Sequence, residues 1–233
     1  DLDRDAEFNL KNVAKQLKAN KNNEWEPLEE DGDFRSDECI KILSESDIVV
    51  TNPPFSLFRE FVQQLFDYKK QFLIIGNINC ITYKEIFPKI RNNEAWLGNG
   101  MGRWISGFIV PKSYELYGTE VKIDECGNSI IATNNCLWLT NIDHGRRHQP
   151  LALMSLADNK KFNKKIIKNE NSYEQYDNYD AIEVPYTDAI PSDYDGIMGV
   201  PITFLDKYNP EQFELIGMAE DNGRGYSGGV MID

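Results

Sequence analysis

Apolar residues between positions 36 and 90 recur with two alternating spacings. Ile48, Val49 and Val50 form a short β-branched run of the kind that fills a parallel strand buried on both faces, and residues 71–77 form a second apolar run. Residues 56–68 carry apolar side chains at helical spacing instead: Leu57, Phe58, Phe61, Val62, Leu65 and Phe66. This order of helix, strand, helix, strand, helix predicts an α/β fold with a parallel doubly wound sheet.

The boundaries of these helices carry recognisable signals. Ser36 is a predicted N-cap for a helix with Ile40, Ile42 and Leu43, and Ser56 is a predicted N-cap for the helix that follows. Pro88 is expected at a kink or at the end of the third helix, because proline has no backbone N–H.

The rest of the chain has a different pattern. Short β-type runs separated by Gly, Asn and Asp fill residues 104–142 and predict antiparallel strands and hairpins. A basic helix or loop is expected at 159–169, and a last strand at 214–218. At the other end of the chain, Phe8, Leu10, Val13 and Leu17 predict one amphipathic helix.

Composition narrows the class of protein. The 233 residues suffice for an α/β domain with a core, and 41% hydrophobic and 12% aromatic residues exclude general disorder. No apolar stretch approaches the roughly 20 residues that span a bilayer, so a cytoplasmic protein without membrane contact is expected. The four cysteines, at positions 39, 80, 126 and 136, are isolated and predict free thiols.

The net charge of −13 limits how the chain can meet nucleic acid. This charge argues against a protein that holds nucleic acid by bulk electrostatics, so any DNA contact must be local. The local basic clusters are residues 144–148, with Arg146 and Arg147, and residues 160–168, with Lys164 and Lys165. These four are candidate phosphate contacts. A solvated helix face explains the lysines equally well. The pair His144 and His148 has no third ligand nearby, and no metal site is predicted.

The strand at 48–50 ends in an unusual way, on Asn52, Pro53, Pro54 and Phe55. In open α/β sheets, ligands bind at the carboxyl ends of the strands. The Asn52 amide and the Pro53 carbonyl offer acceptors on a rigid loop, and Phe55 adds a flat apolar surface, which together suit a planar ligand with an amino group. An ordinary proline-rich strand exit is the alternative.

Several separated segments resemble, in the same order, the EcoRI-like family of adenine-specific DNA methyltransferases. The resemblance spans most of residues 32–217 and is carried by GDFRSDECIKILSESDIVVTNPPFSLFREFV, FLIIGNINCITYKEIFPKI, WLTNIDHGRRH, YDNYDAIEV and DGIMGVPITFLDKYNPEQFELIG. It implies a Rossmann-like class I S-adenosylmethionine methyltransferase sheet with an appended β-rich target-recognition region. Two regions are expected. Residues 1–110 form the catalytic core, which is incomplete at its N-terminus. Residues 111–233 form a β-rich and loop-rich region that recognises DNA and also adds strands to the core sheet.

The resemblance also implies roles for individual residues. Asn52, Pro53, Pro54 and Phe55 match the catalytic motif, in which the Asn amide and the first Pro carbonyl accept from the adenine amino group and the aromatic ring stacks on the flipped base. Asp33 and Phe34 match a pair that binds the adenine of S-adenosylmethionine. The alternative for this pair is a surface turn at Gly32 and Asp33, with Phe34 in the core.

One departure from the family pattern concerns the cofactor loop. No strand with a Gly-containing or acidic turn precedes Asp33, so a fragment lacking the N-terminal cofactor-loop segment is expected. The glycines at 98, 100 and 102 are predicted to form a mobile loop, since the β-type run behind them cannot present a helix N-terminus to a ligand.

The resemblance predicts an enzyme that methylates N6 of adenine in double-stranded DNA, with a restriction endonuclease as a possible partner of the same system. Two alternatives stay open. One keeps the fold and methylates a guanine amine in RNA or a glutamine amide in protein. The other is a catalytically silent DNA-binding or protein-binding module.

Overall fold

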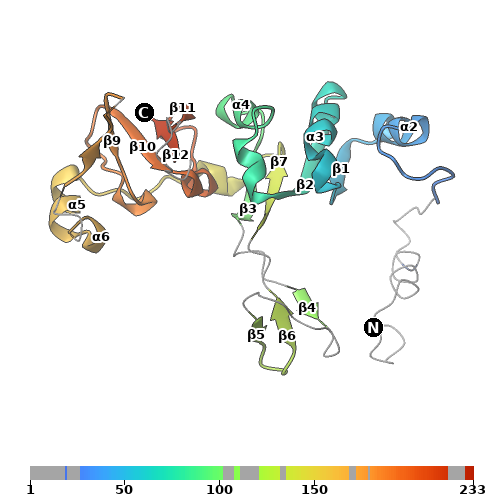
Figure 1. The fold of residues 1–233 in the computed structure, drawn as a ribbon, viewed down its shortest axis with the longest axis horizontal. Helices are drawn as coiled ribbons and strands as arrows, with labels where there is room; N and C mark the ends of the chain where they lie inside the picture. Colours follow the sequence, from blue (N-terminus) through green and yellow to red (C-terminus); the bar gives the residue numbers. More distant parts are fainter. Residues whose placement is uncertain are drawn as a thin grey trace. The chain divides into compact units, whose positions relative to one another are not determined.

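The computed structural model describes residues 19, 27–101, 108–110, 121–131, 135–167, 172–177, 179–219 and 229–233 (Figure 1). It is a mixed α/β structure with several sheets. The chain divides into two compact units, Asp1–Ser46 and Asp47–Asp233, and each is described by itself. The amphipathic helix expected around residues 8–17 lies outside the described residues.

The first unit contains helix α2, Asp37–Glu45. Its N-cap is Ser36, whose Oγ accepts a hydrogen bond from the Cys39 backbone N–H at 3.2 Å. Asp37 and Glu38 lie in the first turn, where the helix dipole favours negative charge. The cap predicted from the sequence is therefore confirmed.

The first sheet of the second unit has the strand order β1-β2-β7-β3. Its strands are β1 (Ile48–Thr51), β2 (Gln71–Asn77), β7 (Cys136–Thr140) and β3 (Trp96–Met101). β1 and β2 pair in parallel, as the alternating pattern predicts, but β7 pairs antiparallel with both β2 and β3. The sheet is mixed rather than purely parallel, because a strand from far downstream lies between β2 and β3.

Strand β1 is less buried than its sequence predicts. Ile48 and Val50 are 49% and 67% exposed, and Val49 is half-buried. Within the described part of the chain, β1 is an edge strand that pairs only with β2. The expectation of a strand buried on both faces is wrong for this reason.

Helix α3, Phe58–Asp67, packs on β2 through Phe58, Val62 and Leu65, which are buried. It is preceded by the 3-10 helix η1, Phe55–Leu57. Ser56 lies inside η1, and the N-cap position of α3 is Leu57, which makes no side-chain cap. The predicted Ser56 cap is wrong because the 3-10 turn occupies the residues assigned to the helix start.

The third predicted helix is short. Residues Ile78–Thr82 form the 3-10 helix η2, and α4 spans only Phe87–Arg91. Pro88 lies in the first turn of α4 rather than at a kink or at the end. Proline is well accommodated there, since first-turn N–H groups have no partner within a helix.

Part of the β-type pattern predicted at 104–142 forms a three-stranded antiparallel sheet in the order β4-β6-β5, whereas its last run is β7 of the first sheet. Its strands are β4 (Phe108–Val110), β5 (Val121–Ile123) and β6 (Ser129–Ile131). The turn between β5 and β6 is closed by the Asp124 carboxylate, which accepts from the backbone N–H groups of Cys126 and Asn128. Gly127 has φ +79° in this turn.

The glycine stretch after residue 97 does not form the predicted loop. Gly98 and Gly100 belong to β3, and Gly102 lies outside the described residues. A Cβ on Gly98 would lie 2.6 Å from the Trp138 Cβ on the neighbouring strand. Close strand packing, rather than mobility, explains this glycine.

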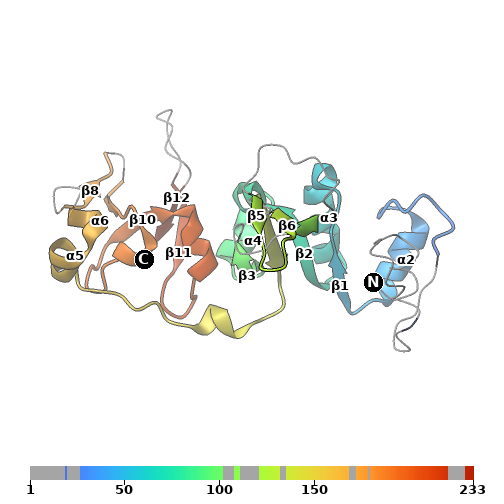
Figure 2. The same ribbon diagram turned by 90° about the horizontal axis from the view of Figure 1, so that it is seen from below.

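A five-stranded sheet of order β11-β12-β10-β9-β8 completes the second unit (Figure 2). The strands are β8 (Glu174–Gln175), β9 (Ala181–Glu183), β10 (Ile197–Pro201), β11 (Leu215–Met218) and β12 (Gly229–Ile232). The strand predicted at 214–218 is confirmed as β11. The pairing of β10 with β9 is parallel, and the other pairings are antiparallel.

Short helices connect the two larger sheets and flank the second one. They are η4 (Gly145–His148), α5 (Leu156–Phe162), α6 (Lys164–Ile167), η5 (Thr187–Ala189) and η6 (Ile202–Lys207). The predicted basic helix or loop is thus two short helices separated at Asn163. Among the helices of the described residues, none is long and apolar enough to cross a membrane.

Candidate functional site

The motif Asn52–Phe55 leaves the carboxyl end of β1 and runs directly into η1. Pro54 has extended backbone, with φ −61° and ψ 124°, and its carbonyl accepts from the Leu57 N–H at 3.1 Å. Pro53 is buried, whereas Asn52 and Pro54 are exposed and Phe55 is 42% exposed. The motif is therefore anchored at Pro53 and presents Asn52 and Phe55 to solvent.

The two acceptors expected from the sequence lie on an exposed residue, Asn52, and on a buried one, Pro53. No donor among the described residues bonds to the Asn52 side-chain amide or to the Pro53 carbonyl. Two acceptors beside an exposed aromatic ring can hold a planar ligand that carries an amino group.

The packing beneath the motif depends on Gly76 in β2. A Cβ at this position would lie 2.6 Å from the Phe58 Cζ and 3.1 Å from the Cys80 Sγ. Phe58 is buried and is the first residue of α3, three residues after Phe55. Gly76 thus makes room for the side chain that fixes the start of α3 behind the motif.

Two residues near the motif were missed by the sequence analysis. The Arg59 guanidinium carbon lies 4.3 Å from the centre of the Tyr83 ring, and Arg59 Nε lies 3.8 Å from Glu85 Oε2. Arg59 follows Phe55 by four residues, which is the only signal that the sequence offers. Tyr83 is 24 positions further on and is brought to Arg59 by the fold.

Asp33 and Phe34 lie in the first unit, in the turn that precedes α2. The Asp33 carboxylate accepts from the Arg35 backbone N–H at 2.9 Å, from Nε at 3.0 Å and from Nη2 at 2.7 Å. These hydrogen bonds from Arg35 lower the pKa of Asp33 to about 2, so the carboxylate is ionised at neutral pH. The Arg35 guanidinium also lies 5.4 Å from the centre of the Phe34 ring, which is half-buried.

The turn proposed as the alternative for this pair is also formed. Gly32 has φ +78°, and the Ser36 N–H donates to the Asp33 carbonyl at 2.9 Å. A turn and a binding role do not exclude each other. The carboxylate has about four acceptor positions, of which Arg35 occupies three, so one is left for an amino group.

Arg146 and Arg147, predicted as DNA contacts, are engaged within the chain. Arg146 donates to Asn99 Oδ1 at 2.8 Å and to Asp206 Oδ2 at 2.7 Å. Arg147 donates to Asp143 Oδ1 at 3.1 Å and to Asn93 Oδ1 at 3.3 Å. Their contacts to DNA stay a prediction.

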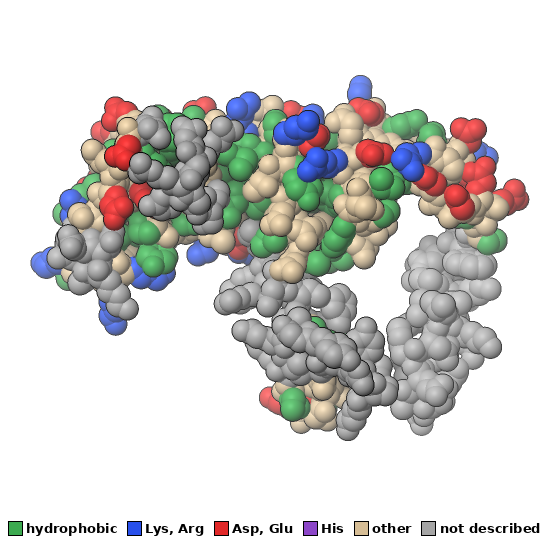
Figure 3. Space-filling model, viewed as in Figure 1, with side chains coloured by type: hydrophobic (Ala, Val, Ile, Leu, Met, Phe, Trp, Pro, Cys, Tyr) green, Lys and Arg blue, Asp and Glu red, His purple; other side chains and the backbone are tan. Residues whose placement is uncertain are grey.

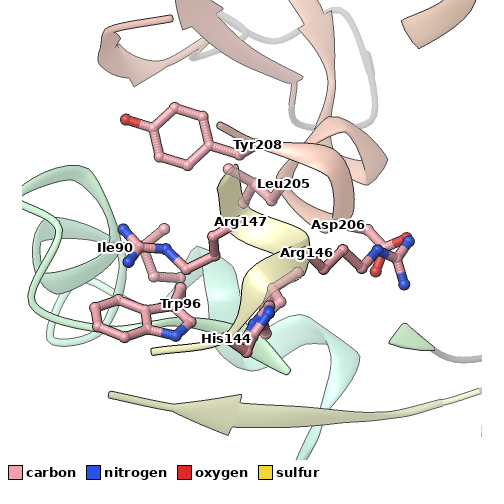
Figure 4. Close-up of a pocket in the computed structure, with 9 residues that line it drawn as sticks. Ile90, Trp96, His144, Arg146, Arg147, Leu205, Asp206 and Tyr208 are labelled. Atoms are coloured by element: carbon pink, nitrogen blue, oxygen red, sulfur yellow. The ribbon is translucent and has the colours of Figure 1, made fainter. Parts of the chain in front are cut away.

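The same segment forms a small pocket between the two larger sheets (Figure 4). The Arg147 guanidinium lies 3.7 Å from the centre of the Trp96 ring, and Arg146 points the other way, toward Asp206. His144 Nε2 donates to the Leu97 carbonyl at 2.9 Å, which leaves Nδ1 buried without a partner among the described residues. This arrangement joins the sheets and has no visible catalytic geometry.

The described lysines of the basic cluster, Lys160, Lys161, Lys164 and Lys165, are exposed. Lys165 pairs with both carboxylate oxygens of Asp188, at 3.0 and 3.1 Å, and lies 4.4 Å from the centre of the Tyr186 ring. Lys164 is exposed at the start of α6. The structure fits a solvated helix face and a DNA contact equally well.

The cysteines and the potential metal ligands form no common cluster within the described residues. Within the described part of the chain, no group of His, Cys, Asp and Glu side chains has the arrangement of a metal site. The four cysteines are free, and burial raises the pKa of the Cys80 thiol to about 12. Cys80 therefore packs against the core as an unreactive thiol.

Comparison with known proteins gives one family. Residues 1–230 match the family described as "Adenine-specific methyltransferase EcoRI". The chain is 62% identical over 186 residues to the type II methyltransferase M.EcoRI of Escherichia coli, covering 80% of this chain and 54% of that protein.

Two relatives from Mycoplasma are more distant. The chain is 40% identical over 194 residues to the type II methyltransferase M.MgeORF184P of Mycoplasma genitalium, covering 81% of this chain and 57% of that protein. It is 39% identical to the type II methyltransferase M.MpnI of Mycoplasma pneumoniae, with 82% and 57% covered. The chain thus spans a little over half the length of these relatives. No solved structure gives a significant match.

Proposed function

This chain belongs to the EcoRI family of adenine-specific methyltransferases, and from this premise we propose that the protein methylates N6 of adenine in double-stranded DNA. The observation that carries the proposal is the arrangement at the end of β1. Asn52 and Pro53 offer two acceptors without partners among the described residues, and Phe55 offers an exposed ring beside them.

The chemistry explains why acceptors are needed there. An exocyclic amine is a poor nucleophile because its lone pair is delocalised into the base. The Asn52 amide oxygen and the Pro53 carbonyl accept hydrogen bonds from this amine, favour a more tetrahedral nitrogen and stabilise the positive charge that develops on it. Pro54 holds the loop in extended form, so both acceptors are in place before the base arrives.

Phe55 lowers the cost of flipping the target base out of the duplex, because the base stacks on its ring. Flipping a nucleotide costs a few kcal/mol of stacking and pairing. Stacking on an aromatic side chain returns about 1–3 kcal/mol per base. The exposed Phe55 ring offsets part of the cost and orients the amine toward Asn52.

The cofactor in this proposal is S-adenosylmethionine, which supplies the methyl group when it is bound. Asp33 and Phe34 are its candidate adenine contacts. The Asp33 carboxylate is ionised and keeps one acceptor position for the cofactor's amino group, and Phe34 is a half-buried aromatic residue next to it in the chain. These residues fit the role.

At the level of domains, we propose a Rossmann-like methyltransferase core in residues 1–110. Residues 111–233 then supply DNA recognition, with Lys164 and Lys165 as candidate phosphate contacts together with Arg146 and Arg147, and β7 as a strand returned to the core sheet. A cognate restriction endonuclease is a possible partner within the same system, and the cytoplasm is the expected location. The family description "Adenine-specific methyltransferase EcoRI" argues against a guanine amine in RNA and against a glutamine amide in protein as the substrate.

The proposal is tested with the full-length protein, double-stranded DNA and S-adenosylmethionine that carries a radioactive methyl group. After digestion to nucleosides, the label is expected in N6-methyldeoxyadenosine. Label in methylcytosine, in RNA or in the protein itself would contradict the proposed substrate. Transfer to no substrate, with DNA still bound, would favour the silent module.

A further inference from the structure

We propose that Arg59 binds a backbone phosphate of the DNA strand that carries the target adenine, and that Tyr83 positions Arg59 for this contact. The inference rests on the proposed function and adds a residue that the family motif does not contain.

Arg59 lies in the first turn of the helix that follows the motif. It is the second residue of α3 and follows Phe55 by four residues. Side chains on a helix lean toward its N-terminus and cover the preceding turn. The turn that precedes Arg59 is η1, which begins at Phe55. A phosphate next to a base stacked on Phe55 therefore falls within reach of the long Arg59 side chain, which is 55% exposed.

The orientation of Arg59 is fixed by two neighbours. The guanidinium carbon lies over the Tyr83 ring, 4.3 Å from its centre. Nε forms an ion pair with Glu85 Oε2 at 3.8 Å, beyond hydrogen-bonding distance. Within the described residues the guanidinium makes no hydrogen bond, so both terminal nitrogens keep their donors. Such a fork matches two phosphate oxygens.

Tyr83 is a firm support for this orientation. Its N–H donates to the Cys80 carbonyl at 3.1 Å, and its carbonyl accepts from the N–H groups of Ile86 and Phe87. Cys80, Ile86 and Phe87 are buried. The ring is thus attached to a backbone held by the core, and the conformational freedom of Arg59 is reduced before DNA binds.

The other arginines differ from Arg59 in the hydrogen bonds of their guanidinium groups. The guanidinium groups of Arg35, Arg146 and Arg147 all donate to side chains of this chain. In the described part of the chain, only Arg59 and Arg91 have guanidinium groups without a hydrogen bond, and Arg59 is the one beside the motif. Because the net charge is −13, a phosphate contact has to be made by such a local cation. Figure 3 shows Lys and Arg side chains on the surface over α3 and α4.

The test compares Arg59→Met with the matched control Arg91→Met in the full-length protein. Methionine keeps an unbranched apolar stem and removes the charge. DNA affinity is measured at several salt concentrations, and kcat and KM for DNA are measured at one of them. We expect Arg59→Met to weaken DNA binding about tenfold and to reduce the slope of log K against log salt by about 1. Arg91→Met is expected to keep the affinity and the slope of the wild type.

Two variants of Tyr83 test its positioning role. Tyr83→Leu removes the ring but leaves the charge of Arg59, so we expect a raised KM for DNA with an unchanged salt slope. Tyr83→Phe keeps the ring and is expected to restore the wild-type KM. Equal KM values for Tyr83→Leu and the wild type would remove Tyr83 from this role.

The outcomes separate this inference from the proposed function. A wild type that methylates adenine, together with an Arg59→Met variant of unchanged slope and KM, overturns the Arg59 assignment alone. Arg59→Gln repeats the test with a polar side chain in case the methionine variant folds poorly. A wild type that neither binds nor methylates DNA overturns the proposed function instead.

Discussion

Asn52 and Phe55 are exposed, although they flank the buried Pro53. The Asn52 amide makes no hydrogen bond to the described residues, so it contributes little to the stability of the fold. A side chain that does not stabilise its own structure can be replaced without unfolding the protein. Because Asn52 contributes little to stability, a loss of activity on its replacement can be attributed to function rather than to unfolding.

Replacing Phe55 tests the stacking role. Phe55→Ala should raise KM for DNA and lower kcat/KM by about 10- to 100-fold, because about 1–3 kcal/mol of base stacking is lost. Phe55→Tyr keeps the ring and should stay close to the wild type. The readouts are steady-state kinetics and the fluorescence of 2-aminopurine at the target position, which rises when the base leaves the stack. A Phe55→Ala enzyme with wild-type kinetics would show that the ring does not contact the base.

For single residues, the sequence predicts which side chains form the candidate site better than it predicts which other side chains they contact. The acceptors and the ring were predicted, since their chemistry follows from residue type. The contact of Arg59 with Tyr83 was not, because the residues lie 24 positions apart and meet only through the fold. The contact of Arg35 with Asp33 spans two residues, and neither its hydrogen bonds nor its effect on the pKa of Asp33 was anticipated.

Elements were predictable where a local signal controls them. Ser36 caps α2 because its own backbone is extended and its hydroxyl reaches the Cys39 N–H. Ser56 has the same residue type, but it lies within a 3-10 turn and cannot cap α3. The placement of β7 between β2 and β3 was not predictable, since pairing of distant strands leaves no local pattern. The four-residue strand β12 was missed because it follows glycines and is short.

Strand β2 gives a prediction at the scale of elements. Gly76→Ala places a methyl group 2.6 Å from Phe58, which is buried and cannot move away freely. We expect destabilisation by about 1–3 kcal/mol in urea unfolding. Gly145→Ala is the control, because no atom lies within 4 Å of its added Cβ, and it should change stability by less than about 0.5 kcal/mol. Equal stabilities for the two variants would mean that Phe58 repacks at little cost.

At the scale of the second unit, the segment 143–148 joins the two larger sheets. Arg146 reaches Asp206 in η6, Arg147 reaches Asn93 after α4, and His148 reaches Glu211 before β11. The sequence predicts Arg146 and Arg147 as DNA contacts from their charge, and this stays a prediction. Charge alone does not reveal that Asp206, 60 residues away in the chain, pairs with Arg146.

His148 makes this junction sensitive to pH. Glu211 at 2.8 Å and Asp143 at 3.0 Å raise the pKa of His148 above its usual value of 6.5. Because this pKa is higher in the folded than in the unfolded protein, protonated His148 stabilises the fold. The contribution is complete at pH values below the unfolded-state pKa and is lost as the pH rises through the folded-state pKa. We therefore expect the urea midpoint of unfolding to be lower at a pH above the folded-state pKa of His148 than at pH 6.

The variant His148→Gln provides the comparison. It keeps a polar side chain but cannot become charged, so its urea midpoint should change less between pH 6 and pH 8.5 than that of the wild type. The same pH dependence in both proteins would show that other groups are responsible.

The central claim, that Asn52 and its neighbours act on the amino group of adenine, is tested most directly in DNA from cells. Plasmid DNA is isolated from cells that make the full-length wild type or Asn52→Ala, and N6-methyladenine is measured by mass spectrometry and located by sequencing. The account predicts N6-methyladenine in one sequence context with the wild type. With Asn52→Ala it predicts a loss of about 100-fold or more in methylation rate, as expected when a preorganised transition-state contact is removed. Binding of S-adenosylmethionine by the purified variant should be unchanged. Absence of N6-methyladenine with the wild type, or equal methylation with Asn52→Ala, would contradict the account.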